Sequence, residues 1–191
     1  MSDSFLQSQL FHKVDFSAIT LPAREFENCT FRECNFASCN LNGIQFTDCS
    51  FTASNLSLAL LNKAAFRNAL FTDCKALGLQ FQTCNPFLFS ATFVNCNLNL
   101  CSFFGLSLAK TKFQECSLQE VDFTKSDLSA AVFSQCDLSR AQFNDTNLQK
   151  ADLRTAYGFD IDAELNKLKG AHFSRQNLHG LLGKYQIRIE D

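Results

Sequence analysis

Residues 113–153 read FQECSLQEVDFTKSDLSAAVFSQCDLSRAQFNDTNLQKADL, and a five-residue repeat runs through the whole stretch. Every fifth residue from Phe113 to Leu153 is Phe or Leu. The residue two places earlier is mostly small, as at Cys116, and the other three positions are mostly polar. A period of five fits neither the 3.6-residue turn of a helix nor the alternation of a strand. The pattern therefore predicts a coil with short sides and regular corners, in which two residues of every five point inward.

The same period extends beyond this stretch. It begins at Phe11, slips by two residues after residue 83 and resumes at Phe93, and it takes in most of the 22 phenylalanines. We call the Phe or Leu position the centre of each pentad. All ten cysteines lie two residues before a centre, which favours a role as small apolar core residues. We expect Cys96, Cys116 and Cys136 to form one vertical ladder.

Centres spaced by twenty residues form columns of a single type. The second run gives Phe93–Phe113–Phe133, Leu98–Leu118–Leu138, Phe103–Phe123–Phe143 and Leu108–Leu128–Leu148. Four pentads per coil would bring like residues about 4.8 Å apart, one strand spacing, where aromatic rings can stack. The sequence therefore predicts an all-β solenoid of about seven four-sided coils.

The repeat boundaries predict five segments. Residues 1–10 form an N-terminal cap, 11–83 a first stack, 84–89 a register slip with Pro86 at the centre position, 90–153 a second stack, and 154–191 a C-terminal cap and dimerisation tail. In the tail we expect a short helix from Asp162 to Lys169, an amphipathic helix after Ser174 and a short final strand. The dimer interface is expected at Leu178, Leu181, Leu182, Tyr185, Ile187 and Ile189.

Composition excludes several classes of function. The formal net charge is −2, from 17 Lys+Arg and 19 Asp+Glu, so we expect no direct binding to nucleic acid. The sequence has no apolar run long enough to span a membrane and no secretory signal, which favours a cytoplasmic protein. A filled coil offers no pocket with convergent acids, bases or nucleophiles, so we expect no enzyme, and we expect no cofactor or metal.

Apolar residues at outward positions mark a candidate partner surface, because exposed apolar groups of this size often mark an interaction patch. They are Leu58, Leu60, Leu70, Phe87, Phe89, Val94, Leu100 and Phe104. The alternative is that single exposed apolar residues are normal. Acidic residues could add a phosphate-like row of charge, or could simply be solvated corners: Glu115, Glu120, Asp122 and Asp127.

Segments such as NFASCNLNG, CDLSRAQF and TNLQKADLR resemble the pentapeptide-repeat family, whose consensus is A(D/N)LXX. The resemblance implies a right-handed quadrilateral β-helix. FTDCKALG before the slip, and the tail FDIDAELNKLKGAHFS, resemble the topoisomerase-protecting branch, which includes quinolone-resistance, albicidin-resistance and microcin-immunity proteins.

This second resemblance implies a cytosolic homodimer with a DNA-like surface. Such a dimer engages DNA gyrase or topoisomerase IV and relieves poisoning by a quinolone or a peptide toxin. Our hypothesis is therefore a non-enzymatic topoisomerase-binding protection factor. The alternatives are a general interaction scaffold with another protein partner, and a structural or host-targeted binding protein.

Overall fold

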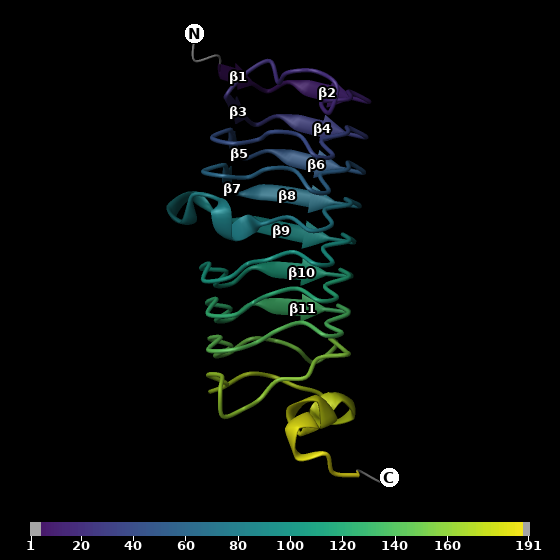
Figure 1. The fold of residues 1–191 in the computed structure, drawn as a ribbon, viewed down its shortest axis with the longest axis vertical. Coiled ribbons are helices and arrows are strands. Elements are labelled where there is room, and N and C mark those ends of the chain that lie inside the picture. Colours follow the sequence, from purple (N-terminus) through teal and green to yellow (C-terminus); the bar gives the residue numbers. More distant parts are fainter. Residues whose placement is uncertain (1–4, 189–191) are drawn as a thin grey trace.

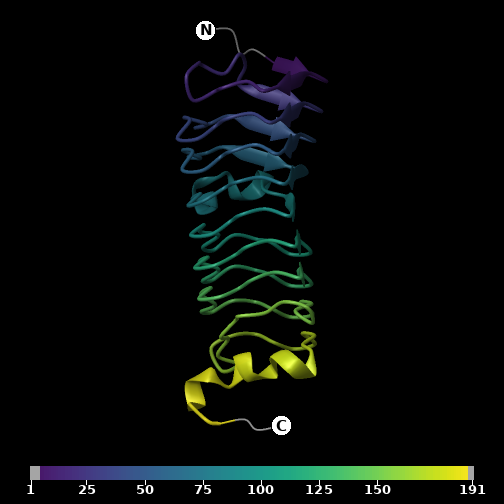
Figure 2. The ribbon, with the colours of Figure 1, turned by 90° about the vertical axis from the view of Figure 1, so that its right-hand side faces the viewer.

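The computed structural model describes residues 5–188, which wind into a long rod around a filled core (Figures 1 and 2). Each coil has four sides, numbered here in chain order from the N-terminus. Side 1 carries β1 (Phe5–Gln7), β3 (Glu25–Glu27), β5 (Gln45–Thr47) and β7 (Ala65–Arg67). Side 2 carries β2 (Leu10–His12), β4 (Thr30–Arg32), β6 (Ser50–Thr52), β8 (Ala69–Thr72), β9 (Ala91–Val94), β10 (Lys112–Gln114) and β11 (Val132–Ser134).

The strands pair in parallel at the predicted spacing. In the first stack Phe31 faces Phe51, and in the second Phe113 faces Phe133, in each case twenty residues along the chain. The seven-stranded sheet of side 2 therefore takes one strand from each successive coil. The predicted all-β solenoid is confirmed, with parallel pairing throughout both sheets.

Sides 3 and 4 are held by single parallel bridges instead of strands, such as Asn35 with Asn55 and Ser102 with Asp122. On these sides an Asn or Asp often stands just before the centre. Its side-chain oxygen accepts a hydrogen bond from the backbone N–H two residues later, as Asn55 does from Ser57 at 3.1 Å. This Asx turn bends the chain immediately after the centre.

Most corners place a residue in the left-handed region, two positions after the centre. Glu33, for example, has a φ of 54°. A residue other than glycine pays roughly 1 kcal/mol for this conformation. The left-handed bend lets the corner N–H reach the next coil, as the Glu33 N–H reaches the Thr52 carbonyl at 2.9 Å. The hydrogen-bonded ladder thus offsets the strain at these corners.

The centres fill the core in vertical columns. On side 2 a column of phenylalanine rings stacks from Phe11 to Phe133, with neighbouring centroids such as Phe51 and Phe71 separated by 4.8 Å. All ten cysteines are free and buried. The predicted ladder of Cys96, Cys116 and Cys136 is present.

The two-residue slip does not divide the rod. β8 and β9 pair directly, with Phe71 facing Phe93 at a spacing of 22 residues. The extra residues are taken up before β9 by two short 3-10 helices, η1 (Phe81–Thr83) and η2 (Pro86–Leu88). They bulge from the flank of the rod in Figure 1. The two predicted stacks are one continuous solenoid.

The coil extends further in both directions than the repeat suggests. Leu6 already pairs with Phe26 in the first coil, so the part of the predicted cap that is described, residues 5–10, belongs to the solenoid. Beyond residue 153, Lys167 still pairs with Asn147 and His172 with Asp152. Residues 162–169 form turns and a bridge where we expected a short helix, because their backbone pairs with the coil above.

The predicted amphipathic helix exists in a tighter form. It begins after Ser174, the expected N-cap, but consists of the 3-10 helices η3 (Arg175–Leu181) and η4 (Gly183–Tyr185). A 3-10 helix has three residues per turn, so the expected stripe at 3.6 residues per turn is broken up. Ile187 is not in a strand, and Ile189 lies outside the described residues.

Candidate interaction surface

The corner between sides 3 and 4 carries two exposed leucines. Leu58 and Leu100 both lie in the left-handed region, two coils apart, with Gly78 between them. Their side chains are 60% and 51% exposed. A side chain on Gly78 would come within 3.0 Å of Leu58 Cδ2, so Leu58 lies over the glycine. Because side chains at these corners point outward, the two leucines make a shallow apolar edge.

Two more apolar residues lie on side 4, next to this edge. Leu60 is 55% exposed and pairs with Asn40, and Phe104 is 44% exposed. The ammonium of Lys125 lies 5.8 Å from the centroid of the Phe104 ring, within the range of a cation–π interaction.

The register slip separates two phenylalanines that the sequence placed on one surface. Phe87 lies in η2, where side 4 turns into side 1, and is 95% exposed. Phe89 is only 9% exposed, and its ring centroid lies 5.5 Å from that of Phe81. Phe89 fills the core position that Pro86 was expected to hold, so the prediction that Phe89 belongs to the surface is wrong. We define the side-4 patch as Leu58, Leu60, Phe87, Leu100 and Phe104.

Other predicted members lie elsewhere. Leu70 and Val94 are on side 2, the side opposite side 4, and Val94 is half-buried. The fold therefore does not bring them to the side-4 patch. Leu77, which the sequence reasoning missed, is half-buried on side 3, and its carbonyl accepts the Leu58 N–H at 3.0 Å. The sequence could have indicated Leu77, because it is a large apolar residue directly after a centre, where polar residues are usual.

The four predicted acids are distributed around the rod. Asp122 lies on side 4, and its carboxylate accepts a hydrogen bond from the Thr124 N–H at 2.9 Å. Asp127 lies on side 1, and its carboxylate accepts one from the Ser129 N–H at 3.0 Å. The remaining two lie at corners: Glu115 between sides 2 and 3, and Glu120 between sides 3 and 4. Glu120 is paired with Arg140 at 2.9 Å. Because four columns share them, these acids do not form one row of negative charge.

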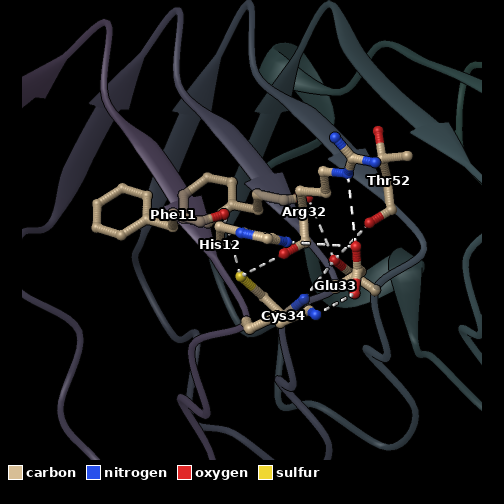
Figure 3. Close-up of polar contacts among 9 residues, drawn as sticks. Phe11, His12, Arg32, Glu33, Cys34 and Thr52 are labelled. Carbon is tan, nitrogen blue, oxygen red and sulfur yellow. Dashed lines mark hydrogen bonds and ion pairs between the residues drawn. The ribbon is translucent and has the colours of Figure 1, made fainter.

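A charged cluster lies at the corner after β2 and β4 (Figure 3). Glu33 is within 3.3 Å of His12 and 3.6 Å of Arg32, and the hydrogen bond from His12 is the main reason why the pKa of Glu33 is lowered. Cys34 lies beneath, where its thiol donates to the Phe11 carbonyl at 3.4 Å. Burial raises the pKa of this thiol, so it stays protonated and is a poor nucleophile.

Within residues 5–188, no group of three or more His, Cys, Asp or Glu side chains is arranged to hold a metal ion. No helix in that part of the chain has the length and apolar character needed to cross a bilayer.

The tail closes the C-terminal end of the core. The side-chain amide of Asn177 donates to the carbonyls of Leu153 and Ala156, both at 2.9 Å. Gly180 packs so closely on Phe159 that any side chain there would collide with the Phe159 carbonyl. η3 is therefore a lid that satisfies backbone groups of the last coils.

Only part of the predicted dimer surface is free on this lid. Leu178, Tyr185 and Ile187 are each about half exposed. Leu181 is half-buried and packs against the core, and Leu182 is also half-buried. Among the described residues of the predicted interface, the exposed apolar group thus consists of Leu178, Tyr185 and Ile187.

The parallel four-sided coil and its five-residue period define an all-β solenoid of pentapeptides. The family model described as pentapeptide repeat region matches residues 44–123, and that described as pentapeptide repeats (8 copies) matches residues 116–154. The chain belongs to the pentapeptide-repeat family. No curated protein sequence matches it closely enough to count as a relative.

Solved structures of QnrB1, a plasmid-mediated fluoroquinolone resistance protein, are similar over their full length. Full-length QnrB1 shares 19% identity, with 96% of this chain and 100% of that chain covered and a TM-score of 0.53. One trypsin-treated variant of QnrB1 shares 20% identity, covers 97% of both chains and has a TM-score of 0.55. At this identity the likeness establishes a common fold.

Proposed function

We propose that this protein is a non-enzymatic protection factor that binds DNA gyrase or topoisomerase IV and counters a poison of these enzymes. The observation that carries the proposal is the match to QnrB1, which covers nearly the whole of both chains. QnrB1 is described as a fluoroquinolone resistance protein. The tail and the FTDCKALG segment, which resemble the topoisomerase-protecting branch, support the same reading.

The side-4 patch is the proposed contact with the topoisomerase. Phe87 lies in η2 and is 95% exposed, while Leu58, Leu100 and Phe104 lie on neighbouring coils. Aromatic residues surrounded by smaller apolar contacts are typical anchors of protein interfaces. The net charge of −2, and the dispersion of Glu115, Glu120, Asp122 and Asp127 over the rod, favour apolar anchoring over charge mimicry of DNA.

A supercoiling assay with purified gyrase and ciprofloxacin tests the proposal. We expect the protein to restore supercoiling in the presence of the drug, and Phe104→Asp or Phe87→Asp to weaken that protection at least tenfold, because a charge would be buried in the contact. Leu70→Asp is the matched control, since Leu70 is also exposed but lies on side 2. Circular dichroism must stay unchanged in all three variants.

Two results would count against the proposal. If the parent protein affects neither gyrase nor topoisomerase IV, the function is wrong. If Leu70→Asp weakens protection as much as Phe104→Asp, the side-4 patch is not the contact.

We further propose that the tail forms a homodimer. Leu178, Tyr185 and Ile187 are exposed together at the C-terminal end, where a two-fold axis would bring the same surface of a second copy against them. Leu178→Glu combined with Ile187→Glu should halve the mass measured by light scattering. Leu165→Glu is the matched control, because Leu165 is equally exposed near the same end. An unchanged mass in the double variant would reject this interface.

A general interaction scaffold with another protein partner remains the second candidate. It is favoured by the weak net charge and by the absence of a single acidic row among the four acids. If the folded protein binds neither DNA gyrase nor topoisomerase IV, the scaffold is the function that we would propose instead.

A further inference from the structure

The first coil is incomplete on side 4. Its strands β1 and β2 pair with the second coil, and Asp15 still pairs with Asn35 on side 3. Among the described residues no bridge joins the next pentad to the second coil, and the ladder resumes at Arg24, whose carbonyl accepts the Gln45 N–H at 2.9 Å. The intervening loop stands away from the coil near the N-terminal end of the rod (Figure 2).

This departure uncovers the backbone edge of the second coil. In a complete side 4, three hydrogen bonds join neighbouring coils: the Leu60 N–H to the Cys39 carbonyl, the Leu41 N–H to the Leu60 carbonyl and the Gly43 N–H to the Asn62 carbonyl. One coil earlier, the equivalent bonds would use the Asn40 N–H, the Asn40 carbonyl and the Asn42 carbonyl. None of these three is formed within residues 5–188.

A cleft of about 780 Å³ lies between the loop and this edge. Ser38, Asn40 and Asn42 line one wall, and Ile19 and Leu21 line the other. Its volume falls within the roughly 300–1,000 Å³ of typical ligand clefts. The cleft therefore presents, on one side, backbone groups that no described residue pairs and, on the other, the apolar residues Ile19 and Leu21, which is the arrangement that an added strand uses.

Arg24 lines the cleft at the point where the chain rejoins the ladder, and its positive charge would favour an anionic group there. The residue is exposed, and it has no ion-pair partner among the described residues. Because the Gln45 N–H is already taken by the Arg24 carbonyl, a strand lying parallel to the second coil must end at this point. The last residue of such a strand would meet the guanidinium.

We propose that the cleft binds an extended peptide of a partner protein by strand addition, parallel to the second coil, with a carboxylate against Arg24. The Asn40 N–H and carbonyl and the Asn42 carbonyl pair with the peptide backbone, and one apolar peptide side chain covers Ile19. The carboxylate is the C-terminus of the partner, because an added strand must end where the Arg24 carbonyl takes the Gln45 N–H. The site shares no residue with the side-4 patch, whose Leu60 pairs with Asn40 from one coil further along the rod.

Fluorescence anisotropy with short labelled peptides tests the site and distinguishes the two sources of carboxylate. The probes are five-residue peptides of alternating Thr and Val: one with a free C-terminus, one amidated, and one amidated with Asp as its last residue. We expect the free peptide to bind about tenfold or more tightly than the amidated one, the gain typical of a hydrogen bond to a charged group. Full recovery of affinity by the Asp peptide would overturn the assignment to a C-terminus and would identify an acidic side chain as the source.

Arg24→Gln is the variant that tests the charge. It should abolish the difference between the free and the amidated peptide while leaving the amidated peptide's affinity unchanged. Continued discrimination by Arg24→Gln, or no binding of any probe at about 1 mM, would overturn the proposal.

Strand addition itself is tested at Asn40. Asn40→Pro removes the N–H that the edge offers, whereas Asn40→Ala keeps it and loses only the side-chain cap to the Asn42 N–H at 3.1 Å. We expect Pro to weaken binding at least tenfold relative to Ala. In the unmodified protein, hydrogen exchange of the Asn40 amide should slow at least tenfold when the free peptide is added, which gives a readout that does not depend on the folding of the proline variant.

Equal binding by both Asn40 variants, or unchanged exchange at Asn40, contradicts strand addition. A further outcome would overturn the peptide proposal. If the protein self-associates, if Asn40→Pro abolishes this self-association and if the peptides do not displace it, the edge binds a second copy of this chain.

Discussion

Side 1 changes character between the two halves of the rod. In the first half it is a four-stranded sheet, ending in β7 (Ala65–Arg67), with phenylalanine at each centre from Phe26 onward. In the second half its centres are leucines such as Leu128, and the chain makes only single bridges, as between Asp127 and Asn147. The same side of one solenoid is thus strand-like before the slip and turn-like after it.

The residue before the centre contributes to this change. On the strand-like sides it is Glu, Gln, Ala, Thr or another residue whose side chain makes no Asx turn. Where it is Asp or Asn, the side-chain oxygen captures the N–H two residues later, as Asp127 does from Ser129 and Asp152 from Arg154. Asp152 follows β11 on side 2, where the strands also stop. An Asp or Asn before the centre therefore favours a turn-like pentad but is not required for one, because Ser107 and Gln142 also make only single bridges.

The largest effects are expected from the two centre columns of side 1. Phe66 is fully buried and stacks on Phe46 at 5.3 Å, and Leu128 is fully buried in the second half. Phe66→Ala should lower the free energy of unfolding by about 4 kcal/mol and Leu128→Ala by about 3 kcal/mol. Urea titrations measure both. A loss below about 1 kcal/mol for either would mean that its half of the core relaxes to fill the cavity.

The junction between the halves provides a matched pair of aromatic variants. Phe89→Ala empties a core position and should lower the free energy of unfolding by about 3 kcal/mol. Phe87→Ala, two residues away on the exposed side, should change it by less than about 0.5 kcal/mol. Thermal unfolding of the two variants side by side gives the comparison. Equal losses would show that Phe87 also supports the junction.

A smaller effect tests the turn chemistry directly. Asp127→Ala removes the cap on the Ser129 N–H and the hydrogen bond from Asn147 at 2.8 Å, and should lower the free energy of unfolding by about 1 kcal/mol. Gln45→Ala is the control at the equivalent position in the strand-like half, where we expect less than about 0.5 kcal/mol. If Gln45→Ala is as destabilising as Asp127→Ala, the proposed difference between the halves is wrong.

The smallest effect concerns the tail, which is neither strand-like nor turn-like in the sense of side 1. Lys184 Nζ lies 2.8 Å from both Asp162 and Glu164, and its hydrogen bonds lower the pKa of each carboxyl below the ordinary values of 3.8 and 4.5. Groups whose pKa is lowered on folding stabilise the structure above the unfolded pKa, and this contribution is lost as the pH falls through the folded one.

Amide exchange in η4 should therefore be faster at about pH 3 than at pH 6, after correction for intrinsic rates. Lys184→Met should make exchange in η4 equally fast at both pH values. If amide exchange in η4 of the unmodified protein has the same corrected rate at about pH 3 and at pH 6, these ion pairs do not stabilise the tail.

Much of the fold could be predicted because the five-residue repeat indicates which side chains point into the core and which point outward. The period of five, the twenty-residue columns and the cysteine ladder follow from Phe, Leu and Cys at fixed spacing. The predictions failed where the period is broken. Phe89 could not be assigned to the core, because the backbone decides whether Pro86 or a residue three places later fills the gap.

The tail was misjudged for a related reason. The apolar spacing of Leu178, Leu181 and Tyr185 fits an α-helix, but Asn177 and Gly180 are fixed on Leu153 and Phe159 of the coils above. Tertiary hydrogen bonds thus override the local period. The candidate surface was half predicted: the exposed leucines break the polar pattern, but which of them share a side depends on counting pentads correctly across the slip.

The sequence by itself determined that the chain coils in four-sided turns around stacked phenylalanine and leucine, because only that path buries two residues in every five. Only the tertiary structure decided that Phe104 and Leu70 face opposite ways, that the first coil leaves the edge at Asn40 uncovered, and that the tail closes the last coils. These features depend on which backbone groups find partners in a neighbouring coil, and such pairing is a property of the assembled stack and not of any one pentad.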